Sequence, residues 1–192
     1  MEATRYWVGI AMVAFGPVTI AFWFSVHPFI AFWRRVGAKT TLAIHCTAMF
    51  LIGSTLMSFH AVLMRGDLGT SYVVAGLAGA LLIVSVVMRY FQNKATPIAI
   101  IMGLYELDPK GHESTLVVRG PYARIRHPRY VQLVMSFAAY ALFANYVTCY
   151  IALALTIIGV RVMIVFEERE LLSRFGDSYR RYMEATPRFV PR

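Results

Sequence analysis

The chain has 192 residues, of which 58% are hydrophobic, and it carries a formal net charge of +9. Soluble domains are about 45–50% apolar. The excess lies in long runs, which predicts an integral membrane protein with a single domain over residues 1–192. The basic residues flank these runs, so the positive-inside rule explains them better than a nucleic-acid partner does. Cys46 and Cys149 lack the spacing of metal ligands, and we expect no metal site.

Three apolar segments in the first half are long enough to span a bilayer, which takes about 20 residues. They run approximately over Tyr6–Trp33, Thr40–Leu63 and Ser71–Phe91. In the first segment Pro17 predicts a kink and His27-Pro28 a local break. His45 or His60 in the second segment could line a cavity, but we expect them to pack between helices.

The third segment contains Gly76 and Gly79, which predict close contacts with a neighbouring helix. Residues 96–104 are apolar but too short to span, which predicts an interfacial or re-entrant segment. Tyr105 to Arg126 is then a long polar connection, and such connections are usually functional. Within it, Thr115 to Val118 predicts a short β-like run. We therefore expect N-terminal spans over residues 1–104 and a functional region over residues 105–192.

Two more apolar helices are predicted, from Tyr130 to about Ala144 and from about Tyr146 to Phe166. The turn at Asn145 between them is so short that they must form an antiparallel hairpin. Beyond them, helical spacing of apolar residues from Glu168 to Glu184 predicts an amphipathic helix. The expected fold is an all-α membrane protein with five transmembrane helices, a C-terminal hairpin, a cytosolic loop and an amphipathic C-terminal helix.

The distribution of basic residues predicts the orientation. With the N-terminus outside, only Arg5 and Arg65 among the loop arginines and lysines fall outside the cell. The C-terminus and the long polar connection are then cytosolic.

The basic stretch from Ser114 to Tyr130 ends where a helix is expected to begin. His127 precedes Pro128, and proline is favoured at the first helical position while it pushes the residue before it out of the α region. His127 is therefore the predicted N-cap. A helix N-terminus carries free N–H groups and partial positive charge, so it can bind a carboxylate or a phosphate. A basic juxtamembrane loop that touches anionic headgroups would explain the same composition.

Antiparallel pairing of the last two spans brings this N-terminus beside Glu167 and Glu168, where the last span ends. A zwitterionic amino-acid group, such as the methionine end of S-adenosylmethionine, fits between the positive helix N-terminus and these negative carboxylates. A structural salt bridge from Arg126 or Arg129 to Glu167 would explain the same residues.

Two motifs resemble those of the isoprenylcysteine carboxyl methyltransferase family. They read G-P-Y-A-R-I-R-H-P-R-Y at Gly120–Tyr130 and E-E-R-E-L-L-S-R-F-G-D-S-Y-R-R-Y at Glu167–Tyr182. Related phospholipid methyltransferases share the pattern more loosely. The resemblance is strong from about Thr115 to Pro191, whereas the first three spans resemble the family only in being apolar. It suggests a small prokaryotic member.

The resemblance implies that S-adenosylmethionine is enclosed beneath the cytosolic loops, with S-adenosylhomocysteine as the product. Carried over by motif, the cofactor contacts would be Ser114, Thr115, Leu116, Val117, Tyr122, His127, Pro128, Arg129, Tyr130, Glu167 and Glu168. Ser114 stands where the family usually has histidine, and His112 lies two residues earlier. Glu167 would hold the cofactor ammonium, with Glu168 as the adjacent candidate. Arg161 is nearest to the family's substrate-facing arginine and would bind the substrate carboxylate.

The implied reaction is methyl transfer to the C-terminal carboxylate of a prenylated cysteine that enters from the bilayer, among membrane lipids. One alternative is N-methylation of a phospholipid amine. Another is an NADPH-dependent sterol-type reductase, in which Arg124, Arg126 and Arg129 would serve a 2′-phosphate. A non-enzymatic scaffold that holds anionic lipid is the third.

Overall fold

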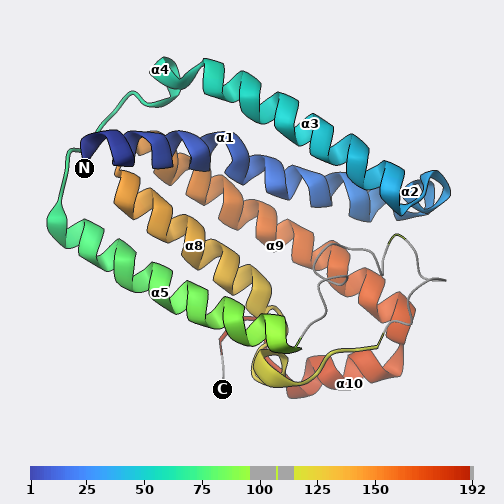
Figure 1. Cartoon of the computed structure of the whole chain (residues 1–192). Coiled ribbons are helices and arrows are strands. Elements are labelled where there is room, and N and C mark those ends of the chain that lie inside the picture. Colours follow the sequence, from blue (N-terminus) through green and yellow to red (C-terminus); the bar gives the residue numbers. More distant parts are fainter. Residues whose placement is uncertain (96–106, 108–114, 191–192) are drawn as a thin grey trace.

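A computed structural model describes residues 1–95, 107 and 115–190 (Figure 1). Its elements are α1 (Glu2–Val26), η1 (His27–Phe29), α2 (Ile30–Val36), α3 (Ala38–Ser58), α4 (His60–Leu63), α5 (Tyr72–Ala95), η2 (Gly120–Ala123), α8 (Pro128–Ala144), α9 (Val147–Phe175) and α10 (Asp177–Ala185). The all-α prediction is confirmed. The segment expected over residues 96–104, together with His112 and Ser114, lies outside the described residues.

Among the residues that the structure describes, four helical segments are long and apolar enough to cross a membrane. They are Glu2–Val36, Ala38–Ser58, Tyr72–Ala95 and Val147–Phe175. The fifth expected span is α8, whose 17 residues extend about 26 Å, slightly less than the roughly 30 Å of a hydrocarbon core. In the apolar 18-residue window of α5 only 11% of residues are buried in the protein, as expected for a helix whose apolar face meets lipid.

The helices pack as one bundle in which α8 lies between α5 and α9 (Figure 1). α1 packs on α8 and α9, and α3 packs on the far side of α1. α1 continues through Pro17, and it gives way at His27–Phe29 to the short 3-10 turn that the His27-Pro28 pair predicted. His45 is buried, with its ring nitrogens at Thr41 O and Ser25 Oγ, so its expected packing role is confirmed.

At the N-terminal end of the bundle, the α8–α9 turn is fastened to the loop between α4 and α5. Asn145 forms the turn in the left-handed conformation, as its predicted position requires, and its side-chain amide donates to Gly69 O. The buried Arg5 donates through Nε to Ala144 O at 3.1 Å and through Nη2 to Asp67 Oδ1 at 2.6 Å. These contacts hold the first, fourth and fifth long helices in register.

Three local predictions are wrong. Residues 115–118 form no strand, because no neighbouring strand among the described residues pairs with them. Gly76 and Gly79 make no close contacts with a neighbouring helix in the described part of the chain: a Cβ at either position would meet nothing within 4 Å, because that face of α5 points outward. For the amphipathic C-terminal helix only the bounds are wrong: it is present as α10 from Asp177, because α9 runs to Phe175 and Gly176, with φ +52°, separates the two helices.

Candidate functional site

The opposite end of the bundle, called here the motif end, carries η2, α10, α2 and the start of α8 (Figure 1). α8 begins at Pro128 with His127 as N-cap, as predicted. The backbone N–H groups of Arg126 and His127 donate to the carbonyls of Pro187 and Arg188, at 2.9 and 3.3 Å. The C-terminal segment therefore lies along the residues that lead into α8.

Glu168 is the centre of a buried ion cluster, and its side chain is only 6% exposed. Its Oε1 lies 3.0 Å from His127 Nε2 and 3.2 Å from Arg126 Nη2. Arg188 donates through Nε to Oε1 and through Nη2 to Oε2. Three basic side chains thus surround one carboxylate, and Glu168 holds the C-terminal segment against α8 and α9.

Glu167, one residue earlier, is bound much less completely. Its Oε2 is 3.6 Å from His127 Nδ1, which is longer than a hydrogen bond. That oxygen is buried and has no hydrogen-bond partner among the described residues. A buried carboxylate oxygen normally has a donor, so the position suits an added cation such as an ammonium. The two candidate glutamates therefore differ: within the described residues, both oxygens of Glu168 are bound, whereas Oε2 of Glu167 is left for a ligand.

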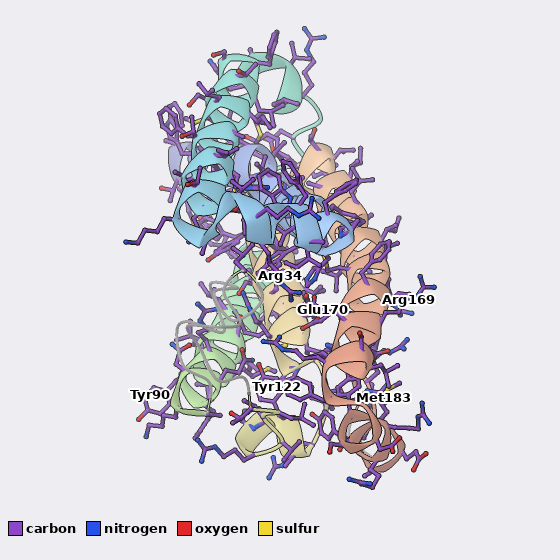
Figure 2. The ribbon with its side chains drawn as sticks, turned by 90° about the vertical axis from the view of Figure 1, so that its right-hand side faces the viewer. Arg34, Tyr90, Tyr122, Arg169, Glu170 and Met183 are labelled. Atoms are coloured by element: carbon purple, nitrogen blue, oxygen red, sulfur yellow. The ribbon has the colours of Figure 1, made fainter. Side chains whose placement is uncertain are left out.

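α10 holds the loop that contains η2. Tyr182 donates its hydroxyl to Tyr122 O at 2.6 Å, and Arg126 Nη1 donates to Met183 O at 2.7 Å. Figure 2 labels Tyr122 and Met183 at this end of the bundle. Burial, and then the charges of Glu168 and Glu167, raise the pKa of Tyr179 well above its ordinary value. α10 thus buries neutral phenols beneath the ion cluster.

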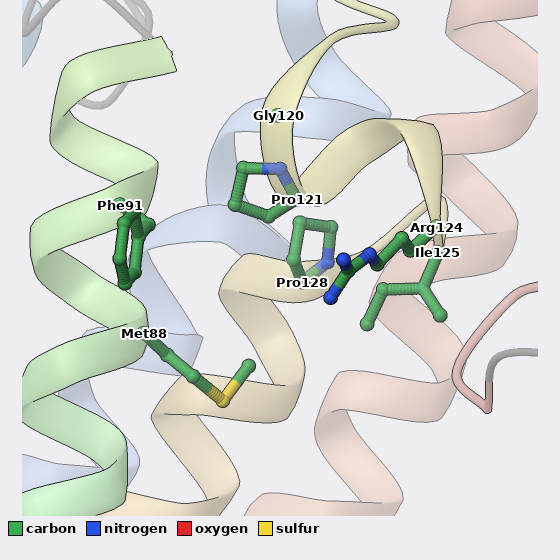
Figure 3. Close-up of a pocket in the computed structure, with 7 residues that line it drawn as sticks. All are labelled: Met88, Phe91, Gly120, Pro121, Arg124, Ile125 and Pro128. Carbon is green, nitrogen blue, oxygen red and sulfur yellow. The ribbon is translucent and has the colours of Figure 1, made fainter.

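One pocket at this end, called here the η2 pocket, has a volume of about 480 Å³ and lies between η2 and the end of α5 (Figure 3). It is lined by Met88, Phe91, Gly120, Pro121, Arg124, Ile125 and Pro128. Its walls are mainly apolar, with one guanidinium from Arg124. The first motif thus supplies most of its lining.

A second pocket, called here the four-helix pocket, has a volume of about 240 Å³ and lies among α1, α5, α8 and α9. It is lined by Thr19, Ile20, Trp23, Arg89, Arg129, Tyr130, Gln132, Leu133, Val160 and Met163. The Arg129 guanidinium lies 5.5 Å from the centre of the Trp23 ring. The Tyr130 ring lies 5.8 Å from the ring of His127, centre to centre, so this pocket adjoins the ion cluster.

A further ion cluster joins α9 to the end of α1. His27 Nδ1 lies 3.0 Å from Glu170 Oε2, and Arg34 Nη2 lies 3.6 Å from Glu170 Oε1. Figure 2 shows Arg34 and Glu170 close together where α2 meets α9. The His27 ring stacks on Trp23 with centres 5.2 Å apart. The His27 ring, itself bound by Glu170, therefore holds the Trp23 ring in its position in the four-helix pocket.

The structure brings only some of the sequence-predicted site residues together. His127, Glu167 and Glu168 meet in the ion cluster. Pro128 lines the η2 pocket, whereas Arg129 and Tyr130 line the four-helix pocket. Thr115 is exposed, Leu116 and Val117 are half-buried, and none of the three lines either of these pockets. The alternative salt bridge exists between Arg126 and Glu168 rather than Glu167.

Arg161 lies on an exposed face of α9, and its guanidinium is 5.4 Å from the centre of the Phe189 ring. Its substrate contact stays a prediction. Sequence reasoning missed Arg188 and Phe189, which lie in a short tail without helical spacing, and it missed Arg89. For Arg89 a signal existed, because an arginine near the end of an apolar span is expected to face a cavity or the interface.

Comparison with known proteins identifies the family to which the chain belongs. The model of the family described as phospholipid methyltransferase matches residues 74–178, which run from α5 into α10. Methanethiol S-methyltransferase 1 of Bradyrhizobium diazoefficiens is 35% identical over 71 residues, which are 36% of this chain and 24% of that protein. The chain thus spans about a quarter of this relative.

No solved structure gives a significant match. The family match includes both the hairpin and the glutamates of the ion cluster, and it confirms the resemblance to membrane methyltransferases of the isoprenylcysteine type. With more than half of its length matched, the chain belongs to the phospholipid methyltransferase family of membrane methyltransferases.

Proposed function

We propose that the protein transfers a methyl group from S-adenosylmethionine to a nucleophile carried by a lipid, and that Glu167 holds the ammonium of the methyl donor. The observation that carries this proposal is the buried Oε2 of Glu167, which has no hydrogen-bond partner among the described residues. Glu168 cannot take the same role as readily, because three basic side chains already occupy it.

The residues around Glu167 fit the rest of a zwitterionic donor. α8 begins at Pro128, and the N-terminus of a helix favours a carboxylate. The apolar walls of the η2 pocket, joined to α8 by Pro128, suit a nucleoside. When bound, S-adenosylmethionine supplies an electrophilic methyl group on a sulfonium. The part of the chain described here supplies orientation and exclusion of water.

The substrate we propose is the C-terminal carboxylate of a prenylated cysteine. That carboxylate is already ionised at neutral pH, so the transfer needs no general base. The apolar four-helix pocket and its two arginines support a substrate with an acidic group and an apolar chain. Arg161 stays a proposed contact of the carboxylate, which Arg161→Gln would test by a raised KM.

The family match favours a second candidate, N-methylation of a phospholipid amine. That amine is mainly protonated at neutral pH and needs a proton acceptor. The name of the Bradyrhizobium relative also suggests a thiol as the methyl acceptor, and a thiol would have to be deprotonated as well. The reductase and scaffold alternatives have no support from the family match.

Calorimetry on detergent-purified protein tests the cofactor. We expect binding of S-adenosylhomocysteine and none of NADPH. Glu167→Gln should weaken binding more than tenfold, since a charged hydrogen bond contributes about 1.5–3 kcal/mol. The exposed Glu184 provides a matched control as Glu184→Gln. NADPH binding without S-adenosylhomocysteine binding would reject the proposal.

Methyl transfer tests the acceptor. Labelled S-adenosylmethionine is offered with N-acetyl-S-farnesylcysteine, phosphatidylethanolamine or a small thiol, each in the same detergent. We expect label in a base-labile ester of the farnesylcysteine. Label in the phospholipid alone would identify the phospholipid amine, and not the carboxylate, as the methyl acceptor.

We also propose that the motif end faces the cytosol and the N-terminus the outside. The support is the concentration of arginine and lysine in the connections at that end. Labelling of a single cysteine placed at Val190, in intact cells and in open vesicles, tests this orientation. Equal labelling in intact cells would contradict it.

A further inference from the structure

We propose that the hydroxyl of Tyr179 and Nε of Arg126 bind the α-carboxylate of the methyl donor, next to the ammonium that Glu167 holds. The inference rests on the proposed function and deepens it, because it names the residues that recognise the second charge of the donor. It makes Tyr179 a residue that selects a donor with a complete amino-acid group.

Three buried polar atoms around the ion cluster of Glu168 have no hydrogen-bond partner among the described residues. They are Nε of Arg126, Oε2 of Glu167 and the hydroxyl of Tyr179. Tyr179 is only 1% exposed, and the side chain of Arg126 is 9% exposed. Buried polar groups are normally hydrogen-bonded, and an unsatisfied one costs stability. The three atoms therefore indicate a place where a ligand contributes hydrogen bonds that the described residues do not supply.

The ion cluster brings two of these atoms together. Arg126 Nη2 and His127 Nε2 lie 3.2 and 3.0 Å from Oε1 of Glu168. The other ring nitrogen of His127, Nδ1, lies 3.6 Å from Oε2 of Glu167. The side chains that carry the unsatisfied nitrogen and the unsatisfied carboxylate oxygen therefore meet at this cluster.

Tyr179 reaches the same cluster from α10. Arg126 Nη1 donates to Met183 O on this helix at 2.7 Å, and residues four positions apart on a helix lie on one face. Tyr179 is therefore on the side of α10 that Arg126 contacts. Burial, and then the charges of Glu168 and Glu167, raise the pKa of Tyr179. The charge of Arg126 acts in the opposite direction, which agrees with a hydroxyl close to both signs of charge.

The hydrogen-bonding capacity of the three atoms matches an α-amino-acid group. Nε of Arg126 and the hydroxyl of Tyr179 are donors, whereas the carboxylate oxygen of Glu167 is an acceptor. An α-amino-acid group has a carboxylate that accepts and an ammonium that donates within one small unit. A simple anion would leave Glu167 unpaired, and a simple cation would leave the two donors unpaired. A bound water molecule would also satisfy the three atoms, and the experiment distinguishes it from the amino-acid group.

The start of α8 leaves the direct contacts with the carboxylate to side chains. The positive N-terminus of the helix favours a carboxylate, but the backbone N–H groups of Arg126 and His127 already donate to carbonyls of the C-terminal segment. Pro128, the first residue of the helix, has no N–H. Nε of Arg126 and the hydroxyl of Tyr179 are buried donors that no described residue occupies. They therefore complete the recognition that the helix N-terminus begins.

The experiment removes the carboxylate from the ligand and the hydroxyl from the protein. Affinities for S-adenosylhomocysteine and for decarboxylated S-adenosylhomocysteine, which keeps the ammonium, are measured by calorimetry in one detergent. We expect the wild type to prefer the carboxylated ligand at least about tenfold, as for a hydrogen bond to a charged group. Tyr179→Phe should weaken S-adenosylhomocysteine about tenfold and leave the decarboxylated ligand within about twofold. An undiminished preference would overturn the inference, and it is the result expected if only water binds the hydroxyl.

Thermal unfolding without ligand provides a second readout, which a purely structural role of the hydroxyl would move in the opposite direction. Because the hydroxyl of Tyr179 has no partner among the described residues, Tyr179→Phe should keep the midpoint or raise it by up to roughly 4 °C. Tyr182→Phe is the matched control one turn later on α10, since its hydroxyl donates to Tyr122 O. It should lower the midpoint and change both affinities by the same factor. A lowered midpoint for Tyr179→Phe, or selective loss of the carboxylated ligand in Tyr182→Phe, would overturn the inference.

Glu167→Gln separates this inference from the proposed function. Both ligands carry the ammonium, so this substitution should weaken both, whereas Tyr179→Phe should weaken the carboxylated ligand alone. Wild-type protein that binds neither ligand would reject the proposed function itself. Binding of both ligands with equal affinity would reject the carboxylate site alone.

A second variant serves if Tyr179→Phe does not fold. Arg126→Lys keeps the positive charge beside Glu168 but has no Nε–H. It should reduce the preference for the carboxylated ligand and leave the decarboxylated ligand bound. The same preference in Arg126→Lys as in the wild type would contradict the inference.

Discussion

Glu167 and Glu168 are adjacent on α9, and we predict that neutralising them has opposite consequences. Glu168→Gln should destabilise the protein and change ligand affinity only through loss of structure. Glu167→Gln should leave stability nearly unchanged and weaken S-adenosylhomocysteine binding more than tenfold. The physical reason is that Glu168 is fully bound within the protein, whereas Glu167 has a buried oxygen without a partner in the described residues.

The contacts of Glu168 determine how much stability the Glu168→Gln substitution should remove. Its partners Arg126 and His127 are 9% and 3% exposed, and removal of one member of a buried ion pair costs about 3–5 kcal/mol. Arg188 is 43% exposed, so its pair adds at most about 1 kcal/mol. Glutamine keeps the shape of the side chain and one acceptor oxygen, so we expect a loss of stability at the lower end of this range, about 3 kcal/mol. For Glu167, 25% exposed, we expect less than about 1 kcal/mol.

The assay is the midpoint of thermal unfolding in one detergent, followed by near-ultraviolet circular dichroism. A loss of about 3 kcal/mol lowers the midpoint by roughly 6–12 °C for a chain of this size. Calorimetry with S-adenosylhomocysteine is carried out on the same samples. A midpoint for Glu168→Gln within about 2 °C of the wild type, or unchanged ligand affinity for Glu167→Gln, would refute the assignment of roles.

Four further substitutions test the packing of the fold and the titration of Tyr179. Because burial raises the pKa of Tyr179, the phenol stays neutral in the folded chain while the unfolded chain ionises above about pH 10. Stability should therefore fall with rising pH there by up to about 1.4 kcal/mol per pH unit, and Tyr179→Phe should reduce this slope in alkaline unfolding curves. Arg5→Ala should cost about 2–3 kcal/mol in denaturant unfolding, because its guanidinium joins the N-terminal end of the bundle. Gly16→Ala should cost about 1–3 kcal/mol, because its Cβ would lie 2.5 Å from a ring carbon of Phe137. Gly76→Ala has open space and should be neutral or stabilising by up to about 1 kcal/mol; equal losses in the two alanine variants would contradict the packing.

Local chemistry made much of the fold predictable. Long apolar runs marked the spanning helices, Pro128 marked the start of α8, and Asn145 marked the hairpin turn. Each signal acts within a few residues, through chain length, a missing N–H or tolerance of the left-handed conformation. These features depend little on tertiary contacts, so they can be read from the sequence alone.

The orientation of each helix about its axis was not predictable in this way. A span that is apolar all round has no stripe to indicate which side is buried, and the face with Gly76 and Gly79 was therefore assigned wrongly. Neighbouring residues on a helix point about 100° apart. Packing alone decides that Glu168 turns into the cluster and Glu167 towards its edge. The break at Gly176 was missed because apolar spacing continues across it, although glycine commonly ends a helix.

The contact of the C-terminal tail with the start of α8 has no periodic signal, since it joins segments distant in sequence. Arg188 reaches Glu168 from an irregular segment after α10. Basic residues in such tails are usually solvated, and only the fold shows that this one holds the site together.

The division of the site between helices indicates how related enzymes can differ in substrate. The carboxylates and the N-cap of the proposed donor site lie on α8 and α9, within the part of the chain that matches the family. The four-helix pocket also uses α1, whose Thr19, Ile20 and Trp23 precede residue 74, where the match begins. Trp23 is held by His27, which Glu170 of α9 binds. On the proposed function, substrate choice would therefore change through α1 while the proposed donor site on α8 and α9 stays intact. A methyltransferase of this family whose first helix lacks the Trp23 position should retain S-adenosylhomocysteine binding and lose preference for an acidic amphiphile.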